Sequence, residues 1–429
     1  MERLISLLGL LVMIGLAWLM SSNKRRINAR IIAGGLLLQF VFAGFILWTP
    51  PGFSAPLGRW LSTGVSLFFD QLQGFVESGS LFLFGIFPGG VDEGLPPPAS
   101  LLRSFAFGVL PTIIVFSSLM SVLYYFGVVQ FVVSIMARVM QRTLGVSGAE
   151  SLSAAANVFV GHTEAPLVIR PYLDDMTQSE LNAVMVGGFA TISGGLLAAY
   201  AGMGIDAGHL VTASVISAPA ALLIAKVMQP EVQTPRTLGT VAIDVPRRGV
   251  NAIEAAAIGA TDGMKLAINV AAMLIAFLAL IAMLDSLIAL TGWVIGFRDA
   301  NGESTWSLAS VLGYSFAPIA WLMGIESGDC LQAGQLLGLK TVANEFIAYQ
   351  QLREWTSADT TAALQPRTVK IMTYALSGFS NFGAIGIQIG GIGGLAPSRR
   401  SDLARLGLRA MFGGALACCM TACVAGVLI

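Results

Sequence analysis

Two glutamates interrupt long apolar stretches of the chain, one in each half. Glu164 lies within the segment 154–169, and Glu345 lies within the segment 308–349. An ionisable group at membrane depth costs a few kcal/mol on insertion scales and therefore indicates a functional site. Two carboxylates suit a polar, uncharged solute rich in hydroxyl and N–H donors better than they suit an anion. The structural alternatives are a hairpin tip that reaches headgroup water and a carboxylate that caps a half-helix.

Side chains with neutral oxygens, which can act as cation ligands, accompany both glutamates. They are supplied by Asn157, Thr163, Thr191 and Asn381. Hard cations such as Na⁺ bind several oxygens, often backbone carbonyls that are freed where a helix unwinds, so these residues predict a sodium site. Ordinary hydrogen bonding between helices is the alternative for Asn157 and Thr191. His162 stands two residues before Glu164 and could relay protons or hold the solute.

The sequence contains no recognisable catalytic constellation. Its two histidines, His162 and His209, belong to no HExxH motif, and no serine or cysteine nucleophile has a base at a suitable spacing. The four cysteines form no CxxC pair and are expected to be small buried or lipid-facing residues. A membrane enzyme is therefore disfavoured, and no cofactor is expected beyond a coupling cation.

The composition indicates a polytopic membrane protein. Of 429 residues, 55% are hydrophobic and 11% are charged, whereas soluble domains carry about 25% charged residues. The formal net charge is +0, with 24 basic and 24 acidic residues, so no overall field favours binding to nucleic acid. We expect a multi-pass protein of the inner (plasma) membrane.

Eight segments are long and apolar enough to cross a bilayer, which takes about 20 residues. They are 4–20, 31–48, 105–129, 181–204, 211–228, 270–295, 369–391 and 406–429. The basic cluster 24–26 follows the first segment and no clear cleavage site is present, which favours a true span over a signal peptide. Placing that cluster in the cytoplasm puts both termini in the periplasm. Most other basic loops then fall inside, while Arg353, Arg367 and Lys370 are exceptions.

Two apolar stretches cannot be simple spans. The segment 154–169 is short and interrupted by 161–164, and the segment 308–349 is too long for one pass. If successive spans alternate in direction across the membrane, both stretches must be re-entrant hairpins. The first enters from the cytoplasm and the second from the periplasm. Irregular backbone at membrane depth is tolerated only where it is buried or lines a cavity, so the hairpins indicate a transport pathway. Amphipathic interfacial helices are predicted at 132–142 and 57–76.

Each hairpin precedes a glycine-rich segment, 187–195 in the first half and 377–386 in the second. The two halves start from opposite membrane faces. Inverted repeats with broken helices at matching positions indicate a binding site near the membrane midplane.

Four segments resemble, in order, motifs of the concentrative nucleoside transporter family. They are 157–167, 187–192, 344–349 and 378–382. The resemblance runs over nearly the whole chain. It implies an all-α polytopic membrane protein with eight transmembrane helices, two opposed re-entrant hairpins in an inverted repeat and interfacial amphipathic helices. It also implies a homotrimer and an elevator-type mechanism.

The resemblance divides the chain into a scaffold domain and a transport domain. The scaffold takes 1–130, with the first three spans and an interfacial helix, and 231–300, with a cytoplasmic linker and the sixth span. The transport domain takes 131–230, with the first hairpin and spans four and five, and 301–429, with the second hairpin and spans seven and eight.

The resemblance also implies a substrate site and a sodium site. His162, Thr163 and Glu164 would face the nucleobase. Glu345 and Asn381 would bind the ribose hydroxyls. The full predicted substrate set is Gly161, His162, Thr163, Glu164, Leu196, Glu345, Phe379, Asn381 and Ala384. The predicted sodium ligands are the side chains of Asn157 and Thr191 and the carbonyls of Val160 and Ile192.

The chain departs from the family pattern in two places. His162 stands where bacterial relatives usually carry glutamine, which bears on base preference. Gly383 and Ala384 stand where many members carry a serine that helps to hold the ribose. The loss of that hydroxyl removes one hydrogen bond, worth about 0.5–1.5 kcal/mol.

The hypothesis from the sequence is cation-coupled symport of nucleosides into the cell, with Na⁺ as the ion. Proton-coupled nucleoside symport is the alternative, with Glu164 or His162 as the proton carrier. A facilitator for another small polar uncharged solute, without coupling to a gradient, is a further alternative.

Overall fold

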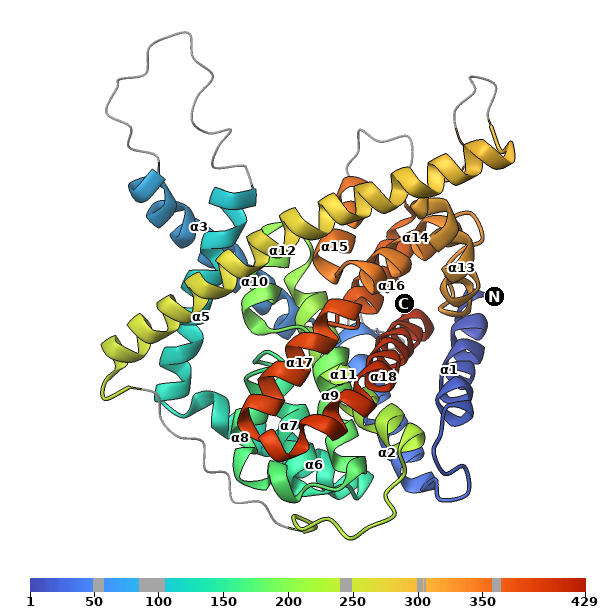
Figure 1. The fold of residues 1–429 in the computed structure, drawn as a ribbon. Coiled ribbons are helices and arrows are strands. Elements are labelled where there is room, and N and C mark those ends of the chain that lie inside the picture. The colour runs from blue at the N-terminus through green and yellow to red at the C-terminus, as the bar shows by residue number, and fades with distance from the viewer. Residues whose placement is uncertain (49–57, 85–104, 240–248, 299–303, 305, 357–363) are drawn as a thin grey trace.

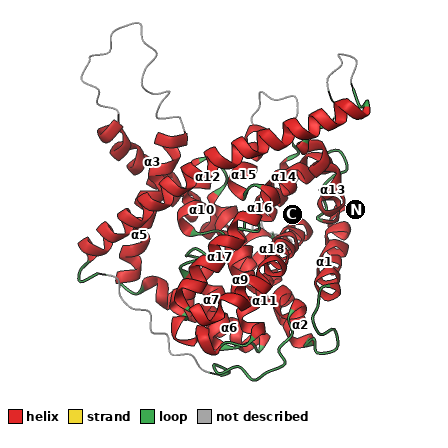
Figure 2. Cartoon of the chain, in the orientation of Figure 1, coloured by secondary structure: helices red, strands yellow, loops and turns green. Residues whose placement is uncertain are grey.

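The computed structural model describes residues 1–48, 58–84, 105–239, 249–298, 304, 306–356 and 364–429. Within these residues the chain is almost entirely helical (Figures 1 and 2), and the extended pairing found there is one isolated bridge between Arg298 and Ser304. The all-α class predicted from the sequence is confirmed for this part of the chain.

The described first half of the chain begins with three long helices and continues with helices of 4 to 22 residues. They are α1 (Glu2–Leu19), α2 (Ala29–Leu47), α3 (Arg59–Phe84), α5 (Leu110–Tyr125), α6 (Val128–Leu144), α7 (Gly148–Asn157), α8 (Ala165–Val168), α9 (Gln178–Ala190), α10 (Gly194–Gly202) and α11 (Ala207–Met228). A π-helical segment, Phe105–Val109, precedes α5, and a 3₁₀ turn, Arg170–Asp175, follows α8.

The second half begins with the longest described helix, continues with five shorter ones and ends with another long one. Its helices are α12 (Ala252–Ile295), α13 (Leu308–Leu322), α14 (Cys330–Val342), α15 (Glu345–Glu354), α16 (Pro366–Leu376), α17 (Phe382–Leu395) and α18 (Arg400–Leu428). A 3₁₀ turn, Pro397–Arg399, leads into α18.

Seven helical segments among the described residues have the length and hydrophobicity to cross a bilayer, and they fall on seven of the eight predicted spans. The remaining predicted span, 369–391, is divided between α16 and α17, which the non-helical residues 377–381 separate. The predicted fourth span is broken in the same way, between α9 and α10. The full count of eight stays a prediction.

The second predicted hairpin differs from expectation. The segment 308–349 forms three helices, in which α13 packs against α14 and the chain then passes through 343–344 into α15. The side chain of Asn344 accepts a hydrogen bond from the Ile347 amide at 3.0 Å and so caps α15. The first hairpin has a simpler form, with α7 leading into the non-helical tip 158–164 and α8 following it.

The predicted amphipathic segment 132–142 lies within α6. Left-handed glycines, Gly127 and Gly145, bound this helix at both ends. Its buried side chains recur at the helical period, while Phe131 and Ile135 are exposed on the other side. The other predicted interfacial segment, 57–76, falls on α3, which continues to Phe84.

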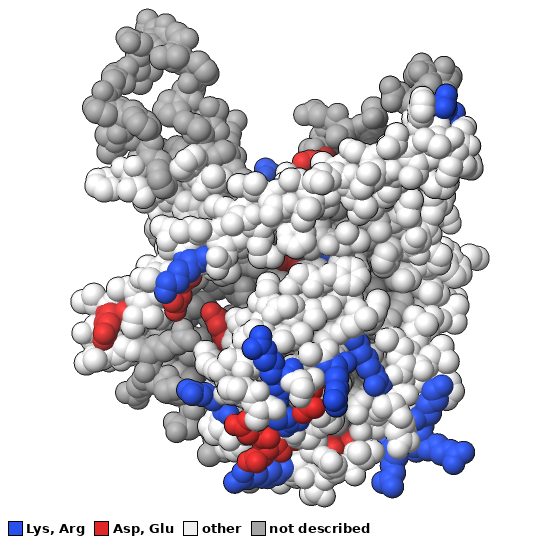
Figure 3. Space-filling model, viewed as in Figure 1, with Lys and Arg blue, Asp and Glu red and all other residues white. Residues whose placement is uncertain are grey.

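The two halves place matching elements at opposite ends of the molecule (Figure 1). In that view α6, α7 and α8 lie toward the lower end, and α13, α14 and α15 lie toward the upper end. Lys and Arg side chains gather at the lower end of the same face, together with acidic ones, while fewer charged side chains are visible among the described residues of its upper part (Figure 3). By the positive-inside rule the lower end is expected to face the cytoplasm.

Helix α12 has 44 residues and is therefore about 66 Å long at 1.5 Å per residue. Its first turn is capped by Asn251, whose side chain accepts from the Glu254 amide at 2.8 Å. The predicted sixth span, 270–295, covers only its second part. Gly259 and Gly263 let α12 approach the backbone of α5 closely, since a Cβ on either would lie within 3.0 Å of α5 atoms.

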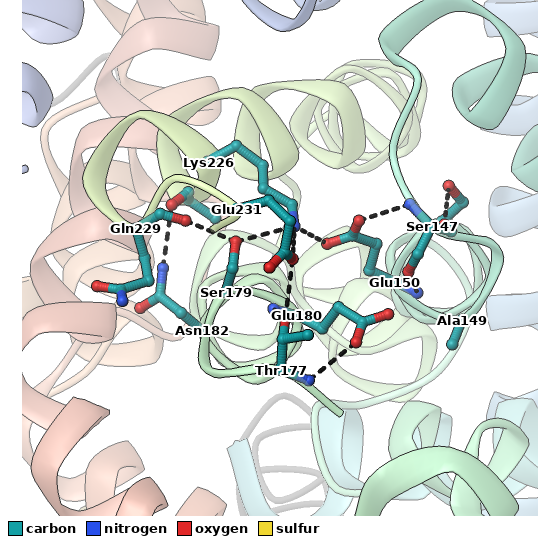
Figure 4. A network of polar contacts seen from close by, with 12 residues as sticks. Ser147, Ala149, Glu150, Thr177, Ser179, Glu180, Asn182, Lys226, Gln229 and Glu231 are labelled. Atoms are coloured by element: carbon teal, nitrogen blue, oxygen red, sulfur yellow. Dashed lines mark hydrogen bonds and ion pairs between the residues drawn. The ribbon is translucent and has the colours of Figure 1, made fainter. Parts of the chain in front are cut away.

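A buried ionic network joins the base of the first hairpin to α9 and α11 (Figure 4). The Lys226 ammonium on α11 lies 2.7 Å from the Glu150 carboxylate on α7 and 3.2 Å from that of Glu231. Lys226 also donates to the Ser179 hydroxyl on α9 at 2.9 Å. Glu150 in turn accepts from the Ser147 amide at 2.6 Å and completes a capping box for α7. The network holds α7, and hence the tip that follows it, against the helices behind.

Replacing Lys226 with methionine tests this network. We expect Lys226→Met to lower the free energy of unfolding by about 3–5 kcal/mol, because it leaves Glu150 buried without its cation. The matched change Lys265→Met removes an exposed partner of Asp262 and is expected to cost about 0–1 kcal/mol. Thermal unfolding of the purified proteins in detergent measures both changes in stability. Equal losses of stability would contradict the interpretation of Lys226 as the centre of a buried ionic network.

Candidate functional site

A cavity of about 800 Å³ lies between α5 and α12 on one side and the broken helices and hairpins on the other. All nine predicted substrate residues line it, together with Val160 of the predicted sodium set. Asn157, Thr191 and Ile192 do not line it and lie buried behind its wall. The residues singled out from two distant halves of the sequence therefore meet around one space.

The tip of the first hairpin approaches the break between α9 and α10. The Gly194 amide donates to the Phe159 carbonyl at 3.2 Å. A Cβ on Gly194 would lie 2.6 Å from that carbonyl oxygen, so the approach requires glycine. Within the tip, the Gly161 amide donates to the Glu164 carboxylate at 3.3 Å. This arrangement fixes the tip beside the cavity while Glu164 remains exposed to it.

Glu345, the first residue of α15, is 3% exposed and accepts two hydrogen bonds from other segments. The Tyr200 hydroxyl on α10 donates to it at 2.9 Å, and the Asn381 side-chain amide donates at 3.3 Å. An ionised carboxylate offers about four acceptor positions, so further positions remain for donors of a bound solute. Asn381 also caps α17, since its side-chain oxygen accepts from the Ala384 amide at 2.8 Å.

Tyr200 was not identified from the sequence. It is fully buried, and its hydroxyl on α10 in the first half of the chain donates a hydrogen bond to Glu345 in the second half. A buried tyrosine usually finds a partner for its hydroxyl, but an isolated tyrosine in an apolar helix does not indicate which carboxylate that partner is.

His162 packs edge-on against Phe379, with ring centroids 4.7 Å apart. Among the described residues, neither ring nitrogen of His162 has a hydrogen-bond partner, and both are buried. Ala384, at the position where the family resemblance implies a serine, offers only its backbone amide, which Asn381 already occupies. The chain therefore departs from the expected set of donors at two points of the cavity wall.

The four predicted sodium ligands share one property. Within the part of the chain that the structure describes, none of these oxygens accepts a hydrogen bond: Asn157 Oδ1, the Val160 and Ile192 carbonyls, and Thr191 Oγ1. The Thr191 hydroxyl instead donates to the Gly187 carbonyl at 2.8 Å. The Asn157 amide lies against this same glycine, where a Cβ would be 3.1 Å from Nδ2. Buried neutral oxygens without donors suit a hard cation, so the residues present fit sodium.

Three family models match successive parts of the chain. "Na+ dependent nucleoside transporter N-terminus" matches residues 8–87, "Nucleoside recognition" matches 106–207, and "Na+ dependent nucleoside transporter C-terminus" matches 209–426. The chain belongs to the concentrative nucleoside transporter family.

Relatives in this family match the chain over its whole length. An uncharacterized transporter of Haemophilus influenzae is 43% identical, and the match covers 98% of that relative. Sodium/nucleoside cotransporter 1 of Rattus norvegicus is 41% identical, and the chain spans 64% of its length. Solute carrier family 28 member 3 of Eptatretus stoutii is 40% identical, and the chain spans 61% of its length.

Solved structures of the family have the same fold. CNTnw in an inward-facing substrate-bound state has a TM-score of 0.87 and 40% identity, covering 100% of this chain and 98% of that one. A CNTnw variant in an outward-facing state has a TM-score of 0.88 and 39% identity, with the same coverage. A member of the concentrative nucleoside transporter family is a transport protein and not an enzyme.

In this family member, Asn157 can be tested as a cation ligand without measuring transport. We expect NaCl to raise the melting temperature of the native chain relative to choline chloride at equal ionic strength, because a ligand that binds only the folded state stabilises it. Asn157→Ala should lose most of this sodium-dependent rise. Asn269→Ala, on the α12 wall of the cavity, should keep it. If NaCl raised the melting temperature of the Asn157 variant as much as that of the native chain, this residue would be excluded from the cation site.

Proposed function

We propose that the chain couples the import of nucleosides to the inward movement of sodium. The observation that carries the proposal is the Glu345 carboxylate, which Tyr200 and Asn381 hold at the cavity wall with acceptor positions to spare. Vicinal hydroxyls of a ribose are donors that suit such a carboxylate. In this proposal Glu345 and Asn381 bind the ribose, Phe379 packs against the substrate, and His162, Thr163 and Glu164 face the base.

The proposed sodium site supports a direct route for coupling. A cation held by the Val160 and Ile192 carbonyls would draw the hairpin tip toward the break between α9 and α10. The same tip carries His162, Thr163 and Glu164, and α10 carries Tyr200, the donor to Glu345. Ordering by either ligand then favours the other, which is reciprocal coupling between the two sites.

The place of the cavity supports an elevator form of alternating access. Its walls come from the proposed scaffold, through α5 and α12, and from the proposed transport domain, through both hairpins and both broken helices. Movement of the second group of elements past the first would carry the site across the membrane. We further propose a homotrimer in the inner membrane with both termini in the periplasm. The charge distribution supports the orientation alone.

Uptake into proteoliposomes tests the function itself. With an inward sodium gradient at fixed pH, labelled uridine or adenosine should accumulate above its external concentration, and collapse of the gradient with a sodium ionophore should abolish this. Uptake that ignores sodium but follows a proton gradient would establish the alternative coupling through Glu164 or His162. Equilibration without accumulation would indicate a facilitator, and no entry of either nucleoside would refute the substrate class.

The variant Glu345→Gln tests the substrate site. It keeps the size of the side chain but removes the charge, so each hydrogen bond to a ribose hydroxyl falls from about 1.5–3 kcal/mol, for a bond to a charged group, toward about 0.5–1.5 kcal/mol, for a neutral one. We expect nucleoside affinity to fall at least tenfold while the protein remains folded and monodisperse. Glu354→Gln changes an exposed glutamate at the far end of the same helix and should bind normally. Unchanged affinity in Glu345→Gln would refute the ribose assignment.

A further inference from the structure

Lys340, near the end of α14, is buried without a carboxylate partner. It is 3% exposed, and its ammonium donates to the Ala375 carbonyl in the last turn of α16 at 2.8 Å. Within the described residues it takes part in no ion pair. Lys226, the other buried lysine of the chain, contacts two carboxylates instead. A buried ammonium held by a carbonyl alone is costly and calls for a role beyond packing.

The carbonyl that Lys340 reaches is an orphan created by the break in the helix. The last four carbonyls of a helix have no partner within it. In α16 each has another donor: the Tyr349 hydroxyl for Thr373, the Ser377 amide for Tyr374, Lys340 for Ala375 and the Gly378 amide for Leu376. Lys340 therefore completes the end of α16 with a positive charge, at the negative end of that helix dipole.

At the corresponding break in the first half, the described residues place no such charge. At the end of α9 the Gly187 carbonyl accepts from the Thr191 hydroxyl. Among the described residues, no donor reaches the carbonyls of Gly188 and Phe189, nor the Asn157 side-chain oxygen nearby. Both breaks thus expose the carbonyl end of a helix. The end of α16 contacts the Lys340 ammonium, whereas the end of α9 lies among oxygens that accept no hydrogen bond.

The two ends also stand in the same relation to the cavity. The break after α9 leads into α10, which carries Tyr200, and the break after α16 leads to Asn381. Both residues donate to Glu345. Lys340 lies near the end of α14, and Glu345 begins α15 directly after the turn that follows it. Whatever orders the second break therefore also positions half of the donors around that carboxylate.

We propose that the Lys340 ammonium is a tethered cation, which takes at the α16–α17 break the place that a mobile sodium ion takes at the α9–α10 break. This inference rests on the proposed sodium site. The ribose half of the cavity is then permanently ordered, and only the first half needs a cation from solution. Lys340 acts as a positioning residue for Asn381 and Glu345 and does not touch the substrate.

Chemical rescue tests the proposal. Lys340→Ala removes a three-carbon ammonium arm, which n-propylammonium matches in length and charge. We expect the variant to have a lower melting temperature and nucleoside affinity reduced at least tenfold. Added n-propylammonium should raise both in a saturable manner, while 1-propanol, its uncharged analogue, should not. The exposed-lysine variant Lys265→Ala and the native chain should show neither the defect nor the rescue.

Lys340→Met separates charge from volume, and it replaces the alanine variant if that one does not fold. Its side chain fills the space, so it should fold, bind nucleoside weakly and ignore n-propylammonium. Native affinity in Lys340→Met would overturn the proposal, as would equal rescue of Lys340→Ala by 1-propanol or no rescue of that folded variant by either compound. The melting-temperature rescue needs no nucleoside. A native chain that binds no nucleoside would therefore refute the proposed function without deciding the role of Lys340.

Discussion

The carbonyls at two broken helix ends, which have no partners within their own helices, are the constraint on which the rest of the structure depends. A helix that stops in an apolar surrounding leaves carbonyl groups that water cannot reach. Near the end of α9 the chain brings neutral oxygens together, and at the end of α16 it brings hydroxyl, amide and ammonium donors. The Gly194 contact with the first hairpin and the Asn381 cap of α17 lie at these breaks.

One carboxylate connects the two ends. Glu345 begins α15, yet its donors come from α10 in the first half and from the start of α17 in the second. A change at either break therefore reaches the same side chain through one hydrogen bond. This short path gives a physical basis for linking an ion-binding event to solute binding without a long chain of intermediate contacts. It also explains why Tyr200 is buried so completely in an otherwise apolar helix.

Hydrophobicity and motif order were sufficient to predict the helical class, most spans and the residues around the cavity. Seven predicted spans coincide with helical segments because about 20 consecutive apolar residues have few other solutions in a bilayer. The division of 308–349 into three helices was missed because the polar residues around Asn344, which caps α15, look in sequence like the tip of a hairpin. Tyr200 and Lys340 were missed for another reason: each acts through a partner more than 30 residues away, which no local pattern encodes.

The burial of α7 restricts where the first hairpin can change shape. All ten residues of this helix are buried, and the Lys226 network anchors its first turn. In the first arm of the hairpin, the residues outside this anchored helix are therefore the non-helical tip 158–164. Fixing one backbone residue costs about 1–2 kcal/mol in conformational entropy. Ordering the tip carries this cost for seven residues and not for the helix that precedes them. The bonds from Gly194 to Phe159 and from Gly161 to Glu164 already restrict part of that loop. A ligand at the tip therefore meets this entropic cost only for the residues of 158–164 that these bonds leave free.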